Sequence, residues 1–402
     1  MYKYKKKQSK RGIPGWMIQG MSQGLLALWR MAKKVVRVLS FPVFSPHSYR
    51  HEASSRAMAD GQDLVDEYEQ SWWQRHKGVF RRVTVGMGLR VLAVPVVLLL
   101  SIGTIVFASV RAGRTGITQF PDGLRLYYES VEFSSDDGTV LRGWFIPSLH
   151  AEDIVAQGDK ALRNKRPGVL LCHGIGGNRS QLLPLAAYLN RRGYEVLLFD
   201  FRACGLSAGQ TRSFGIYEVN DALAAAHYLA GRATVDPQRI AALGLDLGGF
   251  AALGAAARDH SLRGAAVINV DADLRSAVWR RLGQDGLWGQ MCASAYVWGL
   301  QSWFRSNEAQ LSAVRQGQSL GEHQRLLALT SGSQGELQGA AARIVARSPA
   351  QALAVTVPDR ALSPFINAME MGPVLQKWLV ETLELEETLD PTADEAADEK
   401  GS

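Results

Sequence analysis

Cysteine is scarce in this chain of 402 residues, which carries only Cys172, Cys204 and Cys292. The spacing of these three matches neither a set of zinc ligands nor a disulfide framework, so we expect no metal site. No phosphate-binding P-loop is present, and we expect no cofactor. Cys172 and Cys204 follow neighbouring strands of the predicted sheet, where a bridge could form, but buried free thiols are the better prediction.

Charges of one sign are rare at each end of the chain. Residues 1–90 contain 17 Lys and Arg against 6 Asp and Glu, and residues 381–402 contain 9 Asp and Glu against one Lys. The basic end lacks a nucleic-acid module, so we expect it to meet an anionic membrane surface and not nucleic acid. The acidic end has no aromatic residue, and we expect residues 387–402 to form a disordered, solvated tail.

Charge is absent altogether from residues 91–110, between Arg90 and Arg111. At a rise of about 1.5 Å per residue this run spans about 30 Å, the thickness of a bilayer's hydrocarbon core. A buried core helix is the alternative, but core helices are rarely apolar on every face. About 90 residues precede the run, which argues against a cleavable signal peptide. We therefore predict a transmembrane helix over residues 88–112.

The flanks of this run predict its orientation. Five Lys and Arg side chains lie just before it and three just after it, which favours a cytoplasmic N-terminus and an extracytoplasmic main domain. In the basic region 1–87, apolar residues recur at helical spacing over 14–40 and alternate with Lys and Arg. That pattern predicts an amphipathic helix, either on the membrane surface or docked on a protein partner. Residues 45–62 have the composition of a linker.

From about residue 125 the pattern alternates between strands and helices. This alternation predicts an α/β domain over 115–386, with a mostly parallel sheet covered on both faces. The expected strands are 127–134, 139–147, 168–172, 194–201, 240–245, 265–270, 326–330 and 352–357, and the expected helices are 180–192, 217–230, 247–258 and 366–386. Residues 275–322 interrupt the alternation as an aromatic-rich cap insertion. Its rings could roof an apolar pocket, touch the lipid surface or simply pack the cap.

Three motifs follow the strands of this domain. His173-Gly174-Ile175-Gly176 comes after one strand, Asp200-Phe201-Arg202-Ala203-Cys204-Gly205 after the next, and Gly244-Leu245-Asp246-Leu247-Gly248-Gly249 at a strand-to-helix turn. The last is a nucleophile elbow, G-x-S-x-G, with Asp246 in place of serine. Across residues 125–385 the chain resembles bacterial α/β-hydrolases of the serine aminopeptidase and esterase type. The resemblance implies an α/β-hydrolase fold, with His173 and Gly174 in the oxyanion loop and the amides of Ile175 and Leu247 as oxyanion donors.

The acid of the family's triad is altered in this chain. The family carries it in a turn with a Gly-x-x-Asp pattern, and here Gly335 stands in the acid position. Glu336 is one residue away from that position. Asp271 and Asp273, beyond the preceding strand, could serve instead, as they do in some relatives.

The histidine of the triad is missing from its place. It should follow the last strand, but the corresponding loop carries Leu362, and no histidine occurs after His323. His323 precedes its strand and therefore belongs at the edge of the sheet opposite the motifs. His227 and His260 fall on or just after helices, so we expect both to be structural or exposed rather than catalytic bases.

Asp246 itself allows two interpretations. Haloalkane dehalogenases and epoxide hydrolases share this fold and use an elbow aspartate to form an ester, which a histidine-activated water then cleaves. Without the histidine that ester would accumulate. The other interpretation makes Asp246 a helix N-cap or the polar floor of a pocket, since the first turn of a helix favours negative charge.

Two local patterns mimic other sites. Ser207 lies in a literal G-x-S-x-G, but in a loop and not on a strand-to-helix turn, so we expect it to be structural. Gly174 and Gly176 open a helix before the strand that ends at Asp200, as in dinucleotide-binding folds. Arg179 replaces the third glycine of that fingerprint.

These observations predict a membrane-anchored α/β-hydrolase-fold protein that binds a protein partner or a small apolar ligand and does not cleave it. Two alternatives remain open. One is an active hydrolase that attacks ester, amide, epoxide or carbon–halogen bonds with Asp246 as its nucleophile. The other is a structural membrane organiser that acts through the basic N-terminal helix.

Overall fold

The structure is a computed structural model, and it describes residues 63–111, 113–148, 158, 164–282, 287–358 and 368–384. The predicted amphipathic helix, the linker and the acidic tail lie outside these residues. The chain divides into two compact units, Met1–Ala108 and Ser109–Ser402.

The described residues of the first unit, 63–108, belong to one helix, α3, which spans Asp63–Val110 and contains Pro95. The last two residues of α3 belong to the second unit. The window Ala93–Val110 is the one stretch of the described chain that is long and apolar enough to cross a membrane. The prediction that residues 91–110 are helical is confirmed. The helix begins earlier than the predicted span.

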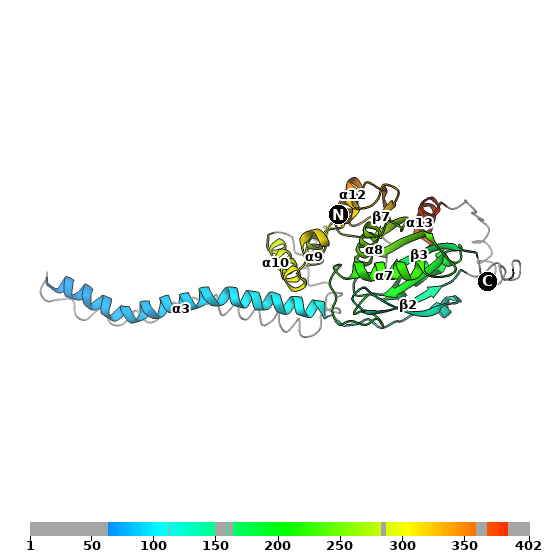
Figure 1. The fold of residues 1–402 in the computed structure, drawn as a ribbon. Coiled ribbons are helices and arrows are strands. Elements are labelled where there is room, and N and C mark those ends of the chain that lie inside the picture. The colour runs from blue at the N-terminus through cyan, green and yellow to red at the C-terminus, as the bar shows by residue number, and fades with distance from the viewer. Residues whose placement is uncertain are drawn as a thin grey trace, which may run out of the picture. The chain divides into compact units, whose positions relative to one another are not determined.

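The second unit is built on one sheet of eight strands in the order β1-β2-β4-β3-β5-β6-β7-β8. Figure 1 shows this sheet with helices packed against it. β1 and β2 form an antiparallel hairpin, β2 is antiparallel to β4, and every other neighbouring pair is parallel. The strands are β1 Glu129–Ser134, β2 Val140–Ile146, β3 Arg166–Cys172, β4 Glu195–Asp200, β5 Val235–Leu245, β6 Gly264–Ile268, β7 Arg325–Ser331 and β8 Gln351–Val357. The prediction of a mostly parallel α/β sheet is confirmed.

Helices cover both faces of this sheet, and each face has its own apolar core. One core contains side chains of α7, α8, α11 and α12, and the other contains side chains of α6 and α13. The central strands are buried on both sides, which explains why their sequences are continuous apolar runs. The helices are η2 Pro121–Leu124, η3 Arg179–Leu182, α6 Leu183–Asn190, α7 Glu218–Ala230, α8 Leu247–Arg258, α9 Leu274–Leu282, α10 Leu287–Phe304, η4 Glu308–Leu311, α11 Ala313–Gln318, α12 Gly335–Arg347 and α13 Ala368–Thr382.

Between β6 and β7 the chain forms α9, α10, η4 and α11, which we call the cap helices. They occupy the stretch where the sequence predicts an insertion. Cys172 and Cys204 are buried free thiols, as predicted, whereas Cys292 on α10 is exposed. Since the carboxyl ends of parallel strands meet at one edge of a sheet, the loops after β3, β4, β5 and β6 converge there and form the candidate site.

Candidate active site

Asp246 occupies a sharp turn between β5 and α8. Its backbone has φ 55° and ψ −117°, a conformation that L residues with a side chain rarely adopt. Such strain amounts to about 1–3 kcal/mol and persists only where the surroundings enforce it. The elbow geometry predicted from the G-x-S-x-G pattern is therefore present, with a carboxylate at its apex.

Close backbone approach enforces this turn. A Cβ atom added to Gly248 would lie 2.2 Å from the carbonyl oxygen of Cys172, and one added to Gly244 would lie 2.2 Å from the carbonyl oxygen of Gly248. A Cβ atom on Gly249 would lie 2.6 Å from the side chain of Val270. These three positions admit only glycine, because helix α8 packs directly on the ends of β3 and β5.

The carboxylate of Asp246 is paired with an arginine of the cap. Arg281 Nη2 on α9 donates to Asp246 Oδ2 at 2.5 Å, and the two side chains are 29% and 23% exposed. A backbone hydrogen bond from Ile175 also reaches this carboxylate. Burial raises the pKa of Asp246, while the charge of Arg281 and the bond from Ile175 oppose that rise.

The N-cap interpretation of Asp246 is wrong in one respect. The residue does stand at the N-cap position of α8, but its side chain makes no capping hydrogen bond. The carboxylate is engaged instead by Arg281 of α9. The polar-floor interpretation fits better, because Asp246 lines a pocket.

The two aspartates proposed as substitute acids are both engaged. Asp271, which follows β6, accepts from Arg280 Nε at 2.9 Å and from Arg280 Nη2 at 2.7 Å, a bidentate pair. Asp273 accepts from the backbone amide and the hydroxyl of Ser276, which fixes the first turn of α9. Asp246 and Asp271 are thus each paired with an arginine of α9, whereas Asp273 is held by an uncharged partner, so three carboxylates at the sheet edge face two guanidinium groups.

A small cavity of about 40 Å³ lies above Asp246. Its lining is mostly apolar and comes from the elbow, the oxyanion loop and the cap. The lining residues are Ile175, Phe214, Asp246, Leu247, Phe250, Val270, Asp271, Asp273, Leu274, Ala277, Arg281 and Leu311. This volume has room for a few water molecules.

Four of the predicted site residues therefore gather around Asp246. Ile175, Leu247, Asp271 and Asp273 all line its pocket, in the positions that the motifs imply. None of the histidines that the structure describes lines this pocket. Among the described residues, no group of three or more His, Cys, Asp and Glu side chains could hold a metal ion.

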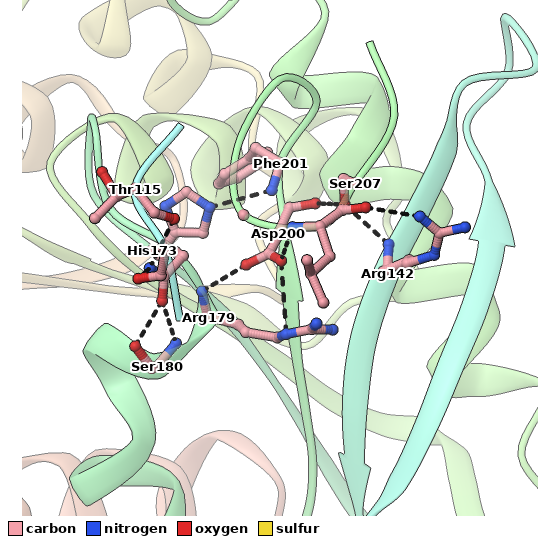
Figure 2. Close-up of polar contacts among 12 residues, drawn as sticks. Thr115, Arg142, His173, Arg179, Ser180, Asp200, Phe201 and Ser207 are labelled. Carbon is pink, nitrogen blue, oxygen red and sulfur yellow. Dashed lines mark hydrogen bonds and ion pairs between the residues drawn. The ribbon is translucent and has the colours of Figure 1, made fainter. Parts of the chain in front are cut away.

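His173 is buried behind this pocket and both of its ring nitrogens are engaged (Figure 2). Its Nε2 accepts from the amide of Phe201 at 3.1 Å, so Nδ1 carries the proton and donates to the carbonyl of Gly174 at 2.8 Å. Burial lowers the pKa of His173, which keeps the ring neutral. The amide of Gly174 donates to Gln181 Oε1 at 2.9 Å. His173 thus shapes the loop that carries Ile175.

Ser207 is fully buried and bonded on both sides, as Figure 2 shows. Its hydroxyl donates to the carbonyl of Asp200 at 2.5 Å and accepts from the amide of Arg142 at 2.9 Å. The Asp200 carboxylate accepts from the amides of Arg179 and Leu206. Both look-alike sites are therefore part of the scaffold: the hydroxyl of Ser207 has no access to solvent, and the carboxylate of Asp200 has no capacity left for a ribose.

Of the remaining triad positions and histidines, those that the structure describes do not line the pocket. Gly335 begins α12, and Glu336 is exposed in the first turn of that helix. The hydrogen bond with Asp271 is the main cause that raises the pKa of Arg280, and the charge of Glu336 adds a small contribution. Leu362 lies outside the described residues. His323 Nε2 is 3.1 Å from the carbonyl of His260, at the amino-terminal ends of β6 and β7 and thus opposite Asp246, as predicted.

Arg280 and Arg281 are the functional candidates that the motifs do not reveal. Arg281 lies 35 residues after its partner Asp246. Two adjacent arginines on a short helix after two aspartates give a local charge pattern, but that pattern names no partner. Only the fold brings α9 over the elbow.

Comparison with known proteins agrees with this geometry. Residues 167–361 match the sequence model of a family described as alpha/beta hydrolase fold. The uncharacterized protein YfhR of Escherichia coli is 36% identical over 121 residues, covering 30% of this chain and 39% of that protein. Polyketide transferase ATR5 of Stachybotrys chlorohalonatus is 35% identical over 143 residues, covering 35% of this chain and 43% of that protein. The chain thus spans about two fifths of the length of these curated relatives.

Among solved structures, an esterase of Pyrococcus furiosus is similar with a TM-score of 0.50 and 20% identity, covering 68% of this chain and 97% of the esterase. At that identity the likeness shows a shared fold alone. The strand order, the elbow and the match over residues 167–361 together show that this chain has the α/β-hydrolase fold.

Proposed function

We propose that this chain is a membrane-anchored, non-catalytic protein with the α/β-hydrolase fold, in which the former nucleophile position fastens the cap over a small binding pocket. The observation that carries the proposal is the ion pair between Asp246 and Arg281. An esterase needs a nucleophile that is free to attack and an oxyanion site that is empty before the reaction. Here the carboxylate is bound by a cap arginine and by the backbone of Ile175.

The general base is the second missing requirement. His173 uses both ring nitrogens in hydrogen bonds to Gly174 and Phe201, and within the described part of the chain no histidine lines the pocket. The sequence has no histidine after His323, so the loop after β8 supplies none either. Without a base, neither a serine-type acyl transfer nor hydrolysis of an aspartyl ester turns over.

The membrane part of the proposal is supported by the window Ala93–Val110 and by the charge bias around it. We propose one span, with the N-terminus cytoplasmic and the hydrolase-fold unit on the other side. The bound partner is then a protein or a small apolar molecule that fits the mostly apolar lining of the pocket.

One observation favours the alternative, an active hydrolase with Asp246 as nucleophile. The strained elbow is retained, and the carboxylate still lies at a pocket between the two oxyanion positions, Ile175 and Leu247. Cap opening would release Asp246 from Arg281. This alternative predicts a covalent ester on Asp246, whereas the binding proposal predicts none.

The full chain in lipid bilayer discs, screened against short acyl esters, aminoacyl anilides, an epoxide and a haloalkane, separates the two. The matched control is Asp246→Asn, which keeps the shape of the side chain and removes its charge. We expect no turnover that depends on Asp246 and no mass increase on the peptide that contains it. Turnover lost in Asp246→Asn would overturn the non-catalytic proposal.

The same panel tests binding directly through thermal unfolding. A compound that binds only the folded chain, and is present at a free concentration 100 times its Kd, raises the free energy of unfolding by about 2.7 kcal/mol. We expect an apolar compound to raise Tm in the wild type without being converted. If no compound raises Tm, pocket binding of this ligand class is contradicted.

A further inference from the structure

Helix α10 is unusual for the surface of a soluble unit. Its 18 residues, Leu287–Phe304, include no Asp, Glu, Lys, Arg or His. One side packs inward, with Ala293, Val297 and Leu300 buried. A helix on a water-exposed surface ordinarily carries charged residues on its outer side, and α10 carries none.

The outer side of α10 exposes large apolar and aromatic side chains. Met291 is 53% exposed, Trp298 is 54% exposed and Trp303 is 49% exposed. Met291 and Trp298 are seven residues apart and so lie on one stripe of the helix. Trp303 lies about 140° around the helix axis from Trp298, so we call Met291 and Trp298 alone the α10 face. A grouping of exposed rings with no charge marks a contact surface rather than a solvated one.

The position of α10 indicates which surface it contacts. Tyr296 Oη of α10 donates to Ser109 Oγ at 2.7 Å, and Ser109 belongs to the same unit as α10. The next residue, Val110, is fully buried and its carbonyl accepts from the amide of Arg212 at 2.9 Å. The ring of Phe214 meets Tyr296 edge-on at 6.3 Å between centroids. α10 is thereby fixed to the residues at which the apolar window Ala93–Val110 ends.

We infer that the α10 face rests on the lipid surface of the bilayer that the α3 span crosses. The inference rests on the proposed anchoring. If residues 93–110 cross the bilayer, Ser109 and Val110 lie at its boundary, and a helix within hydrogen-bond distance of Ser109 lies at headgroup depth. Tryptophan and tyrosine are enriched at that depth, because their rings are apolar with one polar edge.

Lipid contact has a consequence for the candidate site. α10 follows α9 directly, and α9 holds Arg280 and Arg281 on the carboxylates of the sheet edge. The cap therefore links the membrane surface to the pocket above Asp246. A ligand that reaches this pocket from the bilayer would need to displace only the α9 pairs.

The native thiol of Cys292 provides a probe on α10. It is exposed, whereas Cys172 and Cys204 are buried. The full chain is labelled at Cys292 with an environment-sensitive nitrobenzoxadiazole dye and placed in phosphatidylcholine discs, with or without acyl chains brominated near the headgroup. We expect the brominated lipid to reduce the emission about twofold, since bromine quenches only on contact and the label would lie at headgroup depth.

The matched control carries the same dye elsewhere on the same unit. Gln238 is exposed near the start of β5, at the opposite end of that strand from Asp246, and its label in Gln238→Cys/Cys292→Ser is expected to remain unquenched. The second variant, Trp298→Glu, is expected to lower the quenching at Cys292 while its Tm stays close to that of the wild type, because the side chain is exposed. Its control is Leu353→Glu, an equally exposed apolar position on β8, which should leave the quenching unchanged.

The outcomes separate the inference from the proposed anchoring. A chain that fails to float with lipid vesicles in a density gradient would overturn the anchoring and this inference with it. A chain that floats, but whose Cys292 label is quenched no more than the Gln238→Cys label, would overturn the lipid contact of α10 alone.

Discussion

The ion pair between Arg281 and Asp246 makes a quantitative prediction. Replacing Arg281 with methionine keeps the apolar stem and removes the guanidinium group from the buried carboxylate. With about 4 Å between charge centres and an effective dielectric near 20, Coulomb's law gives about 4 kcal/mol for the pair. Both side chains are about a quarter exposed, so solvent screening reduces the expected loss of stability to roughly 1–3 kcal/mol.

Thermal unfolding of the full chain in bilayer discs measures this loss. For a unit of this size each kcal/mol corresponds to about 2–4 °C, so Arg281→Met should lower Tm by roughly 2–12 °C. The matched control is Arg275→Met on the same helix, whose pair with Glu308 at 3.1 Å is half exposed or more on both sides. That control should change the stability by less than about 1 kcal/mol.

The effect should depend on pH with a definite sign. The pKa of Asp246 is already raised by burial, and loss of Arg281 raises it further. Arg281→Met therefore destabilises the fold only where Asp246 is ionised, and the difference from wild type should disappear as the pH falls through the raised pKa of Asp246. The double variant Asp246→Asn/Arg281→Met, which leaves no buried charge, should regain most of the lost stability. Equal Tm values for Arg281→Met and Arg275→Met at pH 7 would refute the assigned role of the pair.

Three further predictions concern the scaffold. Burial raises the pKa of Glu195 from 4.5 to about 7, so the stability that its protonation contributes is complete below pH 4.5 and is lost as the pH rises through 7. Above pH 7 we therefore expect Glu195→Gln to be more stable than the wild type by up to roughly 3 kcal/mol, whereas the control at an exposed position, Glu132→Gln, should show no such gain. A stability difference between Glu195→Gln and wild type that does not vary with pH would contradict this. Ser207→Ala should lower the free energy of unfolding by about 1–3 kcal/mol, because the buried hydrogen bonds of the hydroxyl are lost. A fluorophosphonate should leave Ser207 of the wild type unmodified in peptide mass spectra. A labelled Ser207 would indicate that this serine can act as a nucleophile. Gly248→Ala should lower the free energy of unfolding by about 3 kcal/mol or fail to fold, because its Cβ would meet the Cys172 carbonyl oxygen at 2.2 Å. The control, Gly339→Ala, lies in open space on α12 and should raise the free energy of unfolding by about 0.5–1 kcal/mol. Similar Tm values for the two variants would disprove the close approach.

The sequence predicts the sheet well, because its signals are local. β4 is predicted over 194–201 and observed over Glu195–Asp200, since a strand buried on both faces reads as a continuous apolar run bounded by polar residues. Helix α12 is absent from the prediction although its signal is present. Its buried residues Leu337, Ala340, Ala341 and Ile344 follow the i, i+3, i+4, i+7 spacing of an amphipathic helix.

In the candidate site, too, the sequence predicts the features that depend on neighbouring residues and misses those that depend on residues far apart in the chain. The motif identifies Asp246, and the three glycines around it predict the tight turn that the structure contains. The partner of Asp246 could not be predicted, because the pairing with Arg281 depends on where the cap helices fold back over the sheet edge. The engagement of Asp271 by Arg280 is hidden for the same reason. Sequence spacing alone leaves both aspartates available as acids.

The retained strain at Asp246 agrees with the proposed function. Three features surround this residue: the amino-terminal end of α8, the backbone amide of Ile175 and the guanidinium of Arg281. In an esterase, the first two stabilise the negative charge that develops on a substrate oxygen during the reaction. In our proposal they stabilise a permanent carboxylate, and Arg281 supplies the countercharge from the cap. In this proposal the same electrostatic environment holds the cap in place instead of supporting catalysis. This is a physical reason for the elbow to be present in a chain that lacks the serine and the histidine of the triad at their expected positions.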